Sequence, residues 1–179
     1  MGNFLKIRKH FEILSPDAQA ALLKDLYNFS KDTRLFLEAR LRGGDAWQKY
    51  LDDMKRETIG KVYKSGIPGT PNGRIINSII TRARKAGAGL HTLMELERFA
   101  YRGFIESLNE FGGGPDNFDD QACNHLEAYL RLSKNGSISD EERQEIFTDL
   151  KEYLEHKKNM YTDSIDTVYE EETGLKVSR

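Results

Sequence analysis

Apolar residues recur at spacings of three and four along most of this chain, and this helical period limits its fold more than any other feature. In "SPDAQAALLKDLYNFS" the apolar stripe follows Ser15 and Pro16, which are typical of an N-cap and of the first helical position. We therefore expect a helix over 16–29. The next run, "KDTRLFLEARL", follows Ser30 and stops at two glycines, so the two helices should form a hairpin.

The same period predicts helices through the rest of the chain. A helix is predicted over 46–65, with Val62 facing inward. Further helices are predicted from Arg74 to the glycines at 87 and 89, over 91–111, from about 118 to the Asn-Gly pair after Lys134, and from Ser139 to about 160. The last dozen residues predict a weak helix that frays. On the helix that begins at Arg74, the isoleucines and Ala83 share one side. The opposite side carries Arg74, Ser78, Thr81 and Lys85, with Arg82 and Arg84 at its edges.

No series of alternating apolar and polar residues indicates strands, so the predicted fold class is all-α. About seven or eight helices with short connections predict either an irregular multi-helix bundle or a short array that resembles helical repeats, and no repeat period decides between the two. A chain of 179 residues suits one hydrophobic core. We expect a single helical domain over 1–163 and an acidic, weakly ordered tail over 164–179.

Several classes of protein are disfavoured by composition. The only cysteine, Cys123, cannot form an internal disulfide or a cysteine-based zinc site. Charged residues interrupt the N-terminal segment, and no stretch approaches the roughly 18 apolar residues of a membrane-spanning helix. None of the four histidines follows a glutamate by three residues, as a di-iron helical bundle requires. We expect a cytoplasmic protein without membrane contact, metal or cofactor.

Sequence patterns of catalysis are missing as well. The chain has no Gly-x-Ser-x-Gly, Ser-His-Asp or Cys-His arrangement. Carboxylates cluster at 116–120 and 140–145, where helices are predicted to begin and where the helix dipole favours acids without any catalytic role. We therefore expect no catalytic residue. An enzyme whose site is assembled from distant residues stays open as an alternative.

Charge is unevenly distributed along the chain. Residues 1–103 contain 19 Lys and Arg against 11 Asp and Glu, a net charge of +8, whereas residues 104–179 contain 8 against 18, a net charge of −10. No acid lies between Glu57 and Glu95. Glycines and prolines in this acid-free stretch predict a loop before a helix N-terminus, which can bind an anion. The predicted contact residues are Lys61, Lys64, Arg74, Arg82, Arg84 and Lys85.

Four stretches of the chain together resemble an uncharacterised bacterial family of small helical proteins. They are "ALLKDLYNFSKDTRLFLEARL", "WQKYLDDMKRETIGKVY", "GRIINSIITRARKAG" and "TDSIDTVYEEETG". The resemblance covers most of the chain. It implies an all-helical, cytoplasmic protein of unassigned activity, and it supplies no catalytic residues.

These patterns predict a noncatalytic protein-interaction module, such as an adaptor or a small subunit of a bacterial multiprotein assembly. The basic 55–85 segment would contact one protein partner and the acidic C-terminal third another. The alternative is a nucleic-acid-binding protein that places the same basic residues on phosphates. The oligomeric state stays open.

Overall fold

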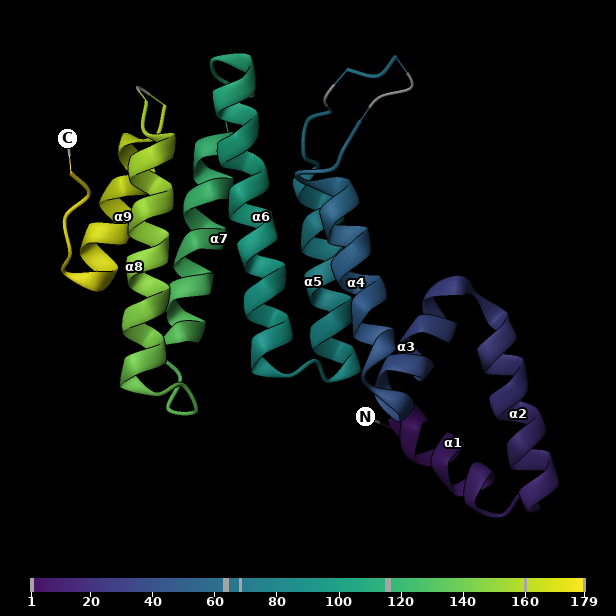
Figure 1. Cartoon of the computed structure of the whole chain (residues 1–179). Coiled ribbons are helices and arrows are strands. Elements are labelled where there is room, and N and C mark those ends of the chain that lie inside the picture. The colour runs from purple at the N-terminus through teal and green to yellow at the C-terminus, as the bar shows by residue number, and fades with distance from the viewer. Residues whose placement is uncertain (1, 63–64, 68, 115–116, 160, 179) are drawn as a thin grey trace. The chain divides into compact units, whose positions relative to one another are not determined.

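The computed structural model describes residues 2–62, 65–67, 69–114, 117–159 and 161–178. Within these residues the chain forms nine helices and no strand, as Figure 1 shows. The predicted all-α fold class and multi-helix arrangement are therefore confirmed. The helix that the sequence pattern does not predict is α1, Gly2–Glu12.

Two compact units divide the chain, Met1–Ala46 and Trp47–Arg179. The first contains α1, α2 and α3, and the second contains α5 to α9 together with most of α4. The boundary between the units falls in the first turn of α4, and the sequence-based division after residue 163 falls at the first residue of α9. The candidate sites described below belong to the second unit.

Two helices of the first unit pack as the predicted hairpin. α2, Pro16–Phe29, and α3, Lys31–Arg42, are separated only by Ser30, which is the C-cap of one and the N-cap of the other. The Ser30 hydroxyl accepts a hydrogen bond at 3.0 Å from the backbone N–H of Thr33. This bond satisfies one of the N–H groups that every helix start leaves open, so one residue can end a helix and begin the next.

Large apolar side chains of the first unit are exposed. α2 has no buried residue, and Phe29 at its end is 81% exposed. The side chains of Phe4 and Ile7 in α1 are also exposed. Exposed apolar surface of this kind commonly marks a region that contacts another protein.

α4, Asp45–Glu57, is shorter than the predicted helix over 46–65. That prediction is wrong for residues 58–62 and 65, and residues 63 and 64 lie outside the described ones. Val62, which was expected to face inward, is 61% exposed. The helix ends because the N–H of Gly60 donates to the carbonyl of Lys55 at 2.8 Å. A further helical turn would need that carbonyl for the residue before the glycine.

α6, Leu90–Phe111, is the longest helix and the centre of the second unit. It packs against α5, Gly73–Ala86, α7, Phe118–Ser133, and α8, Asp140–Lys157. Figure 1 shows α6 between α7 and α5. Ten of its 22 residues are buried, so most of the hydrophobic core of this unit is formed around one helix.

The buried residues of these helices agree closely with the predicted apolar stripes. The apolar stripe predicted for α6 is Leu93, Leu96, Ala100, Phe104 and Leu108; the last four are buried, and Leu93 is half-buried. In α5 the buried residues are Ile76, Ile79, Ile80, Ala83 and Ala86. Ile75 was predicted on the same side but is 45% exposed, because it lies at the edge of that stripe.

The C-terminal part of the chain packs against the rest of the second unit through α9, Asp163–Thr173. This helix contacts α7 and α8. The hydroxyl of buried Tyr169 donates to the carbonyl of Phe147 in α8 at 2.9 Å, and Val177 beyond the helix is 5% exposed. The segment from residue 164 onward therefore contains a helix and buried side chains.

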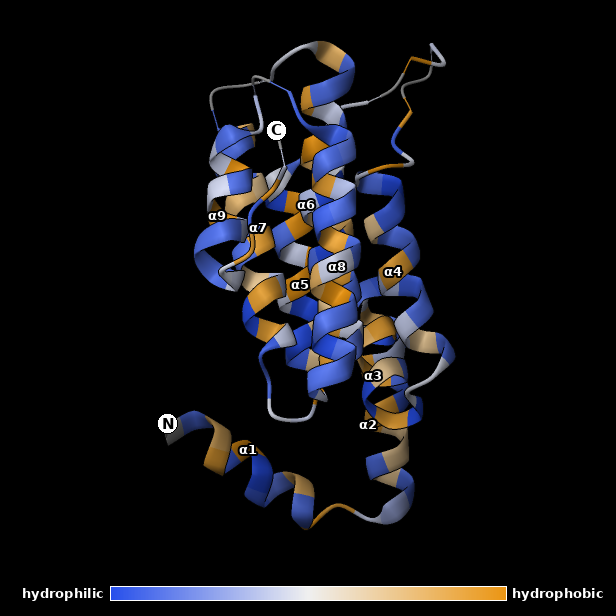
Figure 2. Ribbon diagram, turned by 60° about the vertical axis from the view of Figure 1, so that its left-hand side comes forward, coloured by the Kyte–Doolittle hydropathy of each residue, from blue (hydrophilic) through white to orange (hydrophobic). Residues whose placement is uncertain are grey.

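The outer side of α8 is polar. Figure 2 shows it as mostly hydrophilic, and its exposed acids are Asp140, Glu141, Glu145, Asp149 and Glu152. Across the ranges that the structure describes, no helix combines the length and the apolar composition that crossing a membrane requires.

Candidate functional site

The exposed side of α5 carries several of the predicted contact residues. Asn72 starts this helix, because its side-chain oxygen accepts hydrogen bonds from the backbone N–H groups of Arg74 and Ile75 at 3.1 and 3.3 Å. Two N–H groups of the first turn are therefore already used within the chain. Since three of the four isoleucines and both alanines of α5 are buried, its opposite side faces solvent, as predicted. We call this side the basic α5 face; its exposed residues are Arg74, Ser78, Thr81 and Lys85.

Two cations on the basic α5 face have no partner in the part of the chain that the structure describes. The side chains of Arg74 and Lys85 are exposed, and neither makes an ion pair or hydrogen bond within the described ranges. They lie 11 residues apart in one helix, which corresponds to about 16 Å along its axis. No acid lies on α5. Uncompensated positive charge on a rigid helix attracts a negatively charged partner.

The other two predicted arginines of α5 flank this face. Arg84 donates through Nη2 to Glu97 Oε1 at 2.9 Å, so its charge is at least partly compensated inside the protein. Arg82 is half-buried at the edge of the helix. Both arginines are therefore less available to a partner than Arg74 and Lys85.

Lys61 is engaged within the chain rather than unpaired. Its Nζ donates to Glu57 Oε1 at 2.5 Å, and its aliphatic stem packs against Gly69. Lys64 lies outside the described residues. The structure thus places four of the predicted residues on one helix, whereas Lys61 lies outside that helix and is paired with Glu57.

A buried carboxylate joins α5, α6 and α7. Glu97 is 2% exposed; its Oε1 accepts from Arg84, and its Oε2 lies 2.7 Å from Nδ1 of His125. The ring of His125 stacks parallel to Phe104 with centroids 6.0 Å apart. A buried carboxylate without partners is costly, so these two contacts make an acid tolerable at this position.

Neither Glu97 nor His125 was predicted as part of a site. The sequence contained one indication of a buried acid. Glu97 lies one helical turn before Ala100 and Tyr101, on the buried side of α6. A charged residue at an inward position indicates that a partner exists. Helical period cannot identify that partner when it lies 28 residues away in another helix.

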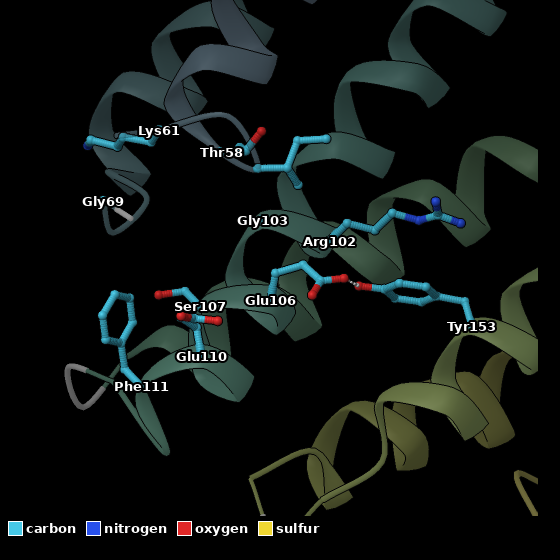
Figure 3. A pocket seen from close by; sticks show the side chains of 11 residues that line it. Thr58, Lys61, Gly69, Arg102, Gly103, Glu106, Ser107, Glu110, Phe111 and Tyr153 are labelled. Atoms are coloured by element: carbon cyan, nitrogen blue, oxygen red, sulfur yellow. Dashed lines mark hydrogen bonds between the residues drawn. The ribbon is translucent and has the colours of Figure 1, made fainter. Parts of the chain in front are cut away.

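A cleft of about 420 Å³ runs along the C-terminal half of α6 (Figure 3). Its walls come from α6, from residues between 58 and 69 and from Tyr153 of α8. Gly103 allows the chain after α4 to lie close to α6, because a Cβ atom at this glycine would be 2.5 Å from Cβ of Thr58. A larger residue at position 103 would push this wall away.

One side of the cleft is formed by a network of paired groups. Glu106 accepts from the Tyr153 hydroxyl at 3.2 Å and from Lys157 Nζ at 2.8 Å, so both of its oxygens are occupied. The guanidinium of Arg102 lies over the ring of Tyr153, 4.4 Å from its centroid. This cation–π contact holds Arg102 beside the tyrosine.

The protonation states of this network follow from burial and neighbouring charges. Burial raises the pKa of Tyr153 well above its ordinary value, and the adjacent Glu106 carboxylate raises it further. Burial alone would lower the pKa of Arg102, but the neighbouring Tyr101 and Tyr153 offset this, and the pKa of Arg102 is raised. Tyr153 therefore remains a hydrogen-bond donor and Arg102 a cation at neutral pH.

The other side of the cleft consists of Ser107, Glu110 and Phe111. Figure 3 shows these three together, apart from Arg102 and Tyr153. Ser107 is 5% exposed, whereas Glu110 and Phe111 are exposed. None of the three was predicted as a site residue, because nothing in the helical pattern shows that this side of α6 borders a cleft.

Comparisons with protein families, with curated proteins and with solved structures found no match. The resemblance to a bacterial family of helical proteins therefore stays a prediction. Among the residues that the structure describes, no group of three His, Cys, Asp or Glu side chains is placed to hold a metal ion.

We expect replacement of Glu97 by alanine to lower the free energy of unfolding by about 3–5 kcal/mol, because it leaves His125 buried without its partner. Glu97→Gln should cost less, since an amide keeps the shape and can accept a hydrogen bond. Urea denaturation measures both. The control is Glu95→Ala on the same helix: Glu95 is half-buried, pairs with Arg98 at 2.6 Å, and should contribute less than about 1 kcal/mol. Equal costs for Glu97→Ala and Glu95→Ala would contradict this account.

The raised pKa of Tyr153 predicts a loss of stability at alkaline pH. Because the folded state holds the phenolic proton more tightly than the unfolded state, the contribution is complete below about pH 10, the ordinary pKa of tyrosine, and declines above it. In urea denaturation, the stability advantage of the wild type over Tyr153→Phe should shrink above that pH by up to about 1.4 kcal/mol per pH unit. A difference that stays constant from pH 8 to pH 11 would show that the phenol is not held protonated.

Proposed function

We propose that this chain is a noncatalytic helical protein-interaction module, an adaptor or small subunit of a multiprotein assembly, whose basic α5 face contacts an acidic surface of a protein partner. The supporting observation is that Arg74 and Lys85 are exposed and have no partner among the described residues. They lie on a helix without acids whose opposite side is buried. Burial of that side fixes the direction of the two cations. A rigid, complementary charge arrangement mainly increases association rate and specificity.

The small number of available cations favours a protein partner over nucleic acid. DNA-binding proteins often neutralise about 6–10 phosphates. Two of the predicted cations, Lys61 and Arg84, are instead paired with Glu57 and Glu97. Nucleic-acid binding, the alternative predicted from the sequence, would have to rely on the few cations that remain.

Exposed apolar side chains in the first unit support the same choice. Phe4, Ile7 and Phe29 are 70%, 63% and 81% exposed. Apolar and aromatic residues are typical of the centres of protein–protein interfaces, whereas interfaces with nucleic acid are more polar and more positively charged. The acidic outer side of α8 would provide a second contact, with a basic partner.

The test replaces both unpaired cations, as Arg74→Gln with Lys85→Gln. The control replaces two exposed cations in the C-terminal third, as Arg131→Gln with Lys176→Gln, which changes the net charge equally. Each tagged protein is isolated from its own cells at native expression level, and co-purifying proteins are quantified. Each is also titrated with labelled single-stranded DNA, duplex DNA and RNA at several salt concentrations.

We expect one or a few proteins in fixed stoichiometry with the wild type and the control, and at least about tenfold less of them with the α5 variant. We also expect no nucleic-acid binding tighter than about 1 μM at physiological salt. Tight binding that falls steeply with salt and is lost in the α5 variant would instead establish the nucleic-acid alternative. Equal recovery of the same partners with all three proteins would exclude the basic α5 face as the contact.

A further inference from the structure

The outer side of α8 carries a row of exposed polar residues with the same spacing as the basic α5 face. The members of this row follow one another at intervals of four, three and four residues, and so do the four exposed residues of the basic α5 face. Such intervals place all four side chains on one narrow side of a helix. We call the row on α8 the acidic α8 stripe; its residues are Glu141, Glu145, Thr148 and Glu152.

The three glutamates of the acidic α8 stripe have no partner among the described residues. Their side chains are exposed and make no ion pair or hydrogen bond there. Two cations of α8 pair with other acids instead, Arg143 with Asp140 at 2.7 Å and Lys151 with Glu155 at 3.7 Å. The negative charge of the stripe is therefore as uncompensated as the positive charge of the basic α5 face.

One molecule cannot bring the two faces together. The buried sides of α5 and α8 pack toward the core of the second unit, and Figure 1 shows the two helices on opposite sides of α6. Their exposed sides are therefore directed away from each other. A second copy of the chain can supply the opposite charge that each face lacks within its own molecule.

The two faces also match in length. Arg74 and Lys85 are 11 residues apart, and so are Glu141 and Glu152, which corresponds to about 16 Å along each helix axis. Because the intervals read the same in both directions, either relative direction of the two helices places a cation opposite an acid at both ends. A hydroxyl of the basic α5 face then lies opposite Glu145.

We propose that the basic α5 face of one copy binds the acidic α8 stripe of a second copy. This inference rests on the proposed function and names the partner of the basic α5 face. Because the two surfaces in contact are different, each bound copy still offers one free face, and further copies can add head to tail. Exposed ion pairs are individually weak and are screened by salt, so the association is reversible and salt-dependent.

The test is sedimentation velocity of the purified full chain at concentrations up to about 0.5 mM, in about 50 mM and about 500 mM salt. One variant reverses the basic α5 face, as Arg74→Glu with Lys85→Glu. The other reverses the acidic α8 stripe, as Glu141→Arg with Glu152→Arg. Each variant is measured alone and in an equal mixture with the other.

Two matched controls change the net charge by the same amounts at exposed positions outside both faces. They are Arg131→Glu with Lys176→Glu, and Glu110→Arg with Glu171→Arg. Association that depends only on net charge would change equally in these controls and in the reversed variants.

We expect the wild type and both controls to associate beyond a dimer in about 50 mM salt, with a Kd of about 10–100 μM, and at least about tenfold more weakly in about 500 mM salt. Each reversed variant should be monomeric alone, because its two faces carry the same charge. The equal mixture should associate again, since each copy then meets a partner of opposite charge. Recovery in the mixture also shows that both variants are folded.

Four results would overturn the proposal: a monomeric wild type at about 0.5 mM, equal losses in the controls, no recovery in the mixture, or a salt-independent dimer that survives both reversals. The last result would assign self-association to another surface, such as the exposed apolar side chains of the first unit. The proposed function fails separately. It requires only that a co-purifying protein be lost when Arg74 and Lys85 are replaced, and a different acidic protein would meet that requirement while the purified chain stays monomeric.

Discussion

Burial of α6 is the constraint on which the second unit depends. Ten of its 22 residues are buried, and α5, α7 and α8 all pack against it. A helix in this position cannot hold an unpaired charge, so Glu97 requires Arg84 from α5 and His125 from α7. Because Glu97 and its two partners lie on three different helices, a shift of any one helix would leave a buried charge unsatisfied. The pairing therefore favours one register of the three helices.

The two candidate surfaces follow from how α6 is covered. Packing of the isoleucine side of α5 leaves Arg74 and Lys85 directed outward on a fixed helix. On another side of α6, Gly103 admits the chain after α4 without filling the space along the C-terminal half, and Tyr153 of α8 closes the far wall. Packing around α6 thus positions both the basic α5 face and the cleft along α6, and the two have no residue in common.

Helical period was sufficient to predict elements whose apolar stripe is packed, such as α6 and α5. It did not predict where α4 ends. There the Gly60 N–H donates a hydrogen bond to the Lys55 carbonyl in place of the next helical bond. The absence of acids over 58–94 drew attention to α5, whose contact role stays a prediction. The sequence did not show that Lys61 pairs with Glu57. It also did not show the cleft, because the residues that line it come from separate segments of the chain.

Native-state hydrogen exchange of the full chain tests the central role of α6 most directly. If α6 is the structural centre, the amides of 94–108 should exchange only through global unfolding, with opening free energies equal to the stability measured by denaturant. No residue of α2 is buried. The amides of α1 and α2 should therefore exchange with much smaller opening free energies. Exchange of the α6 amides as fast as those of α2 would contradict the account.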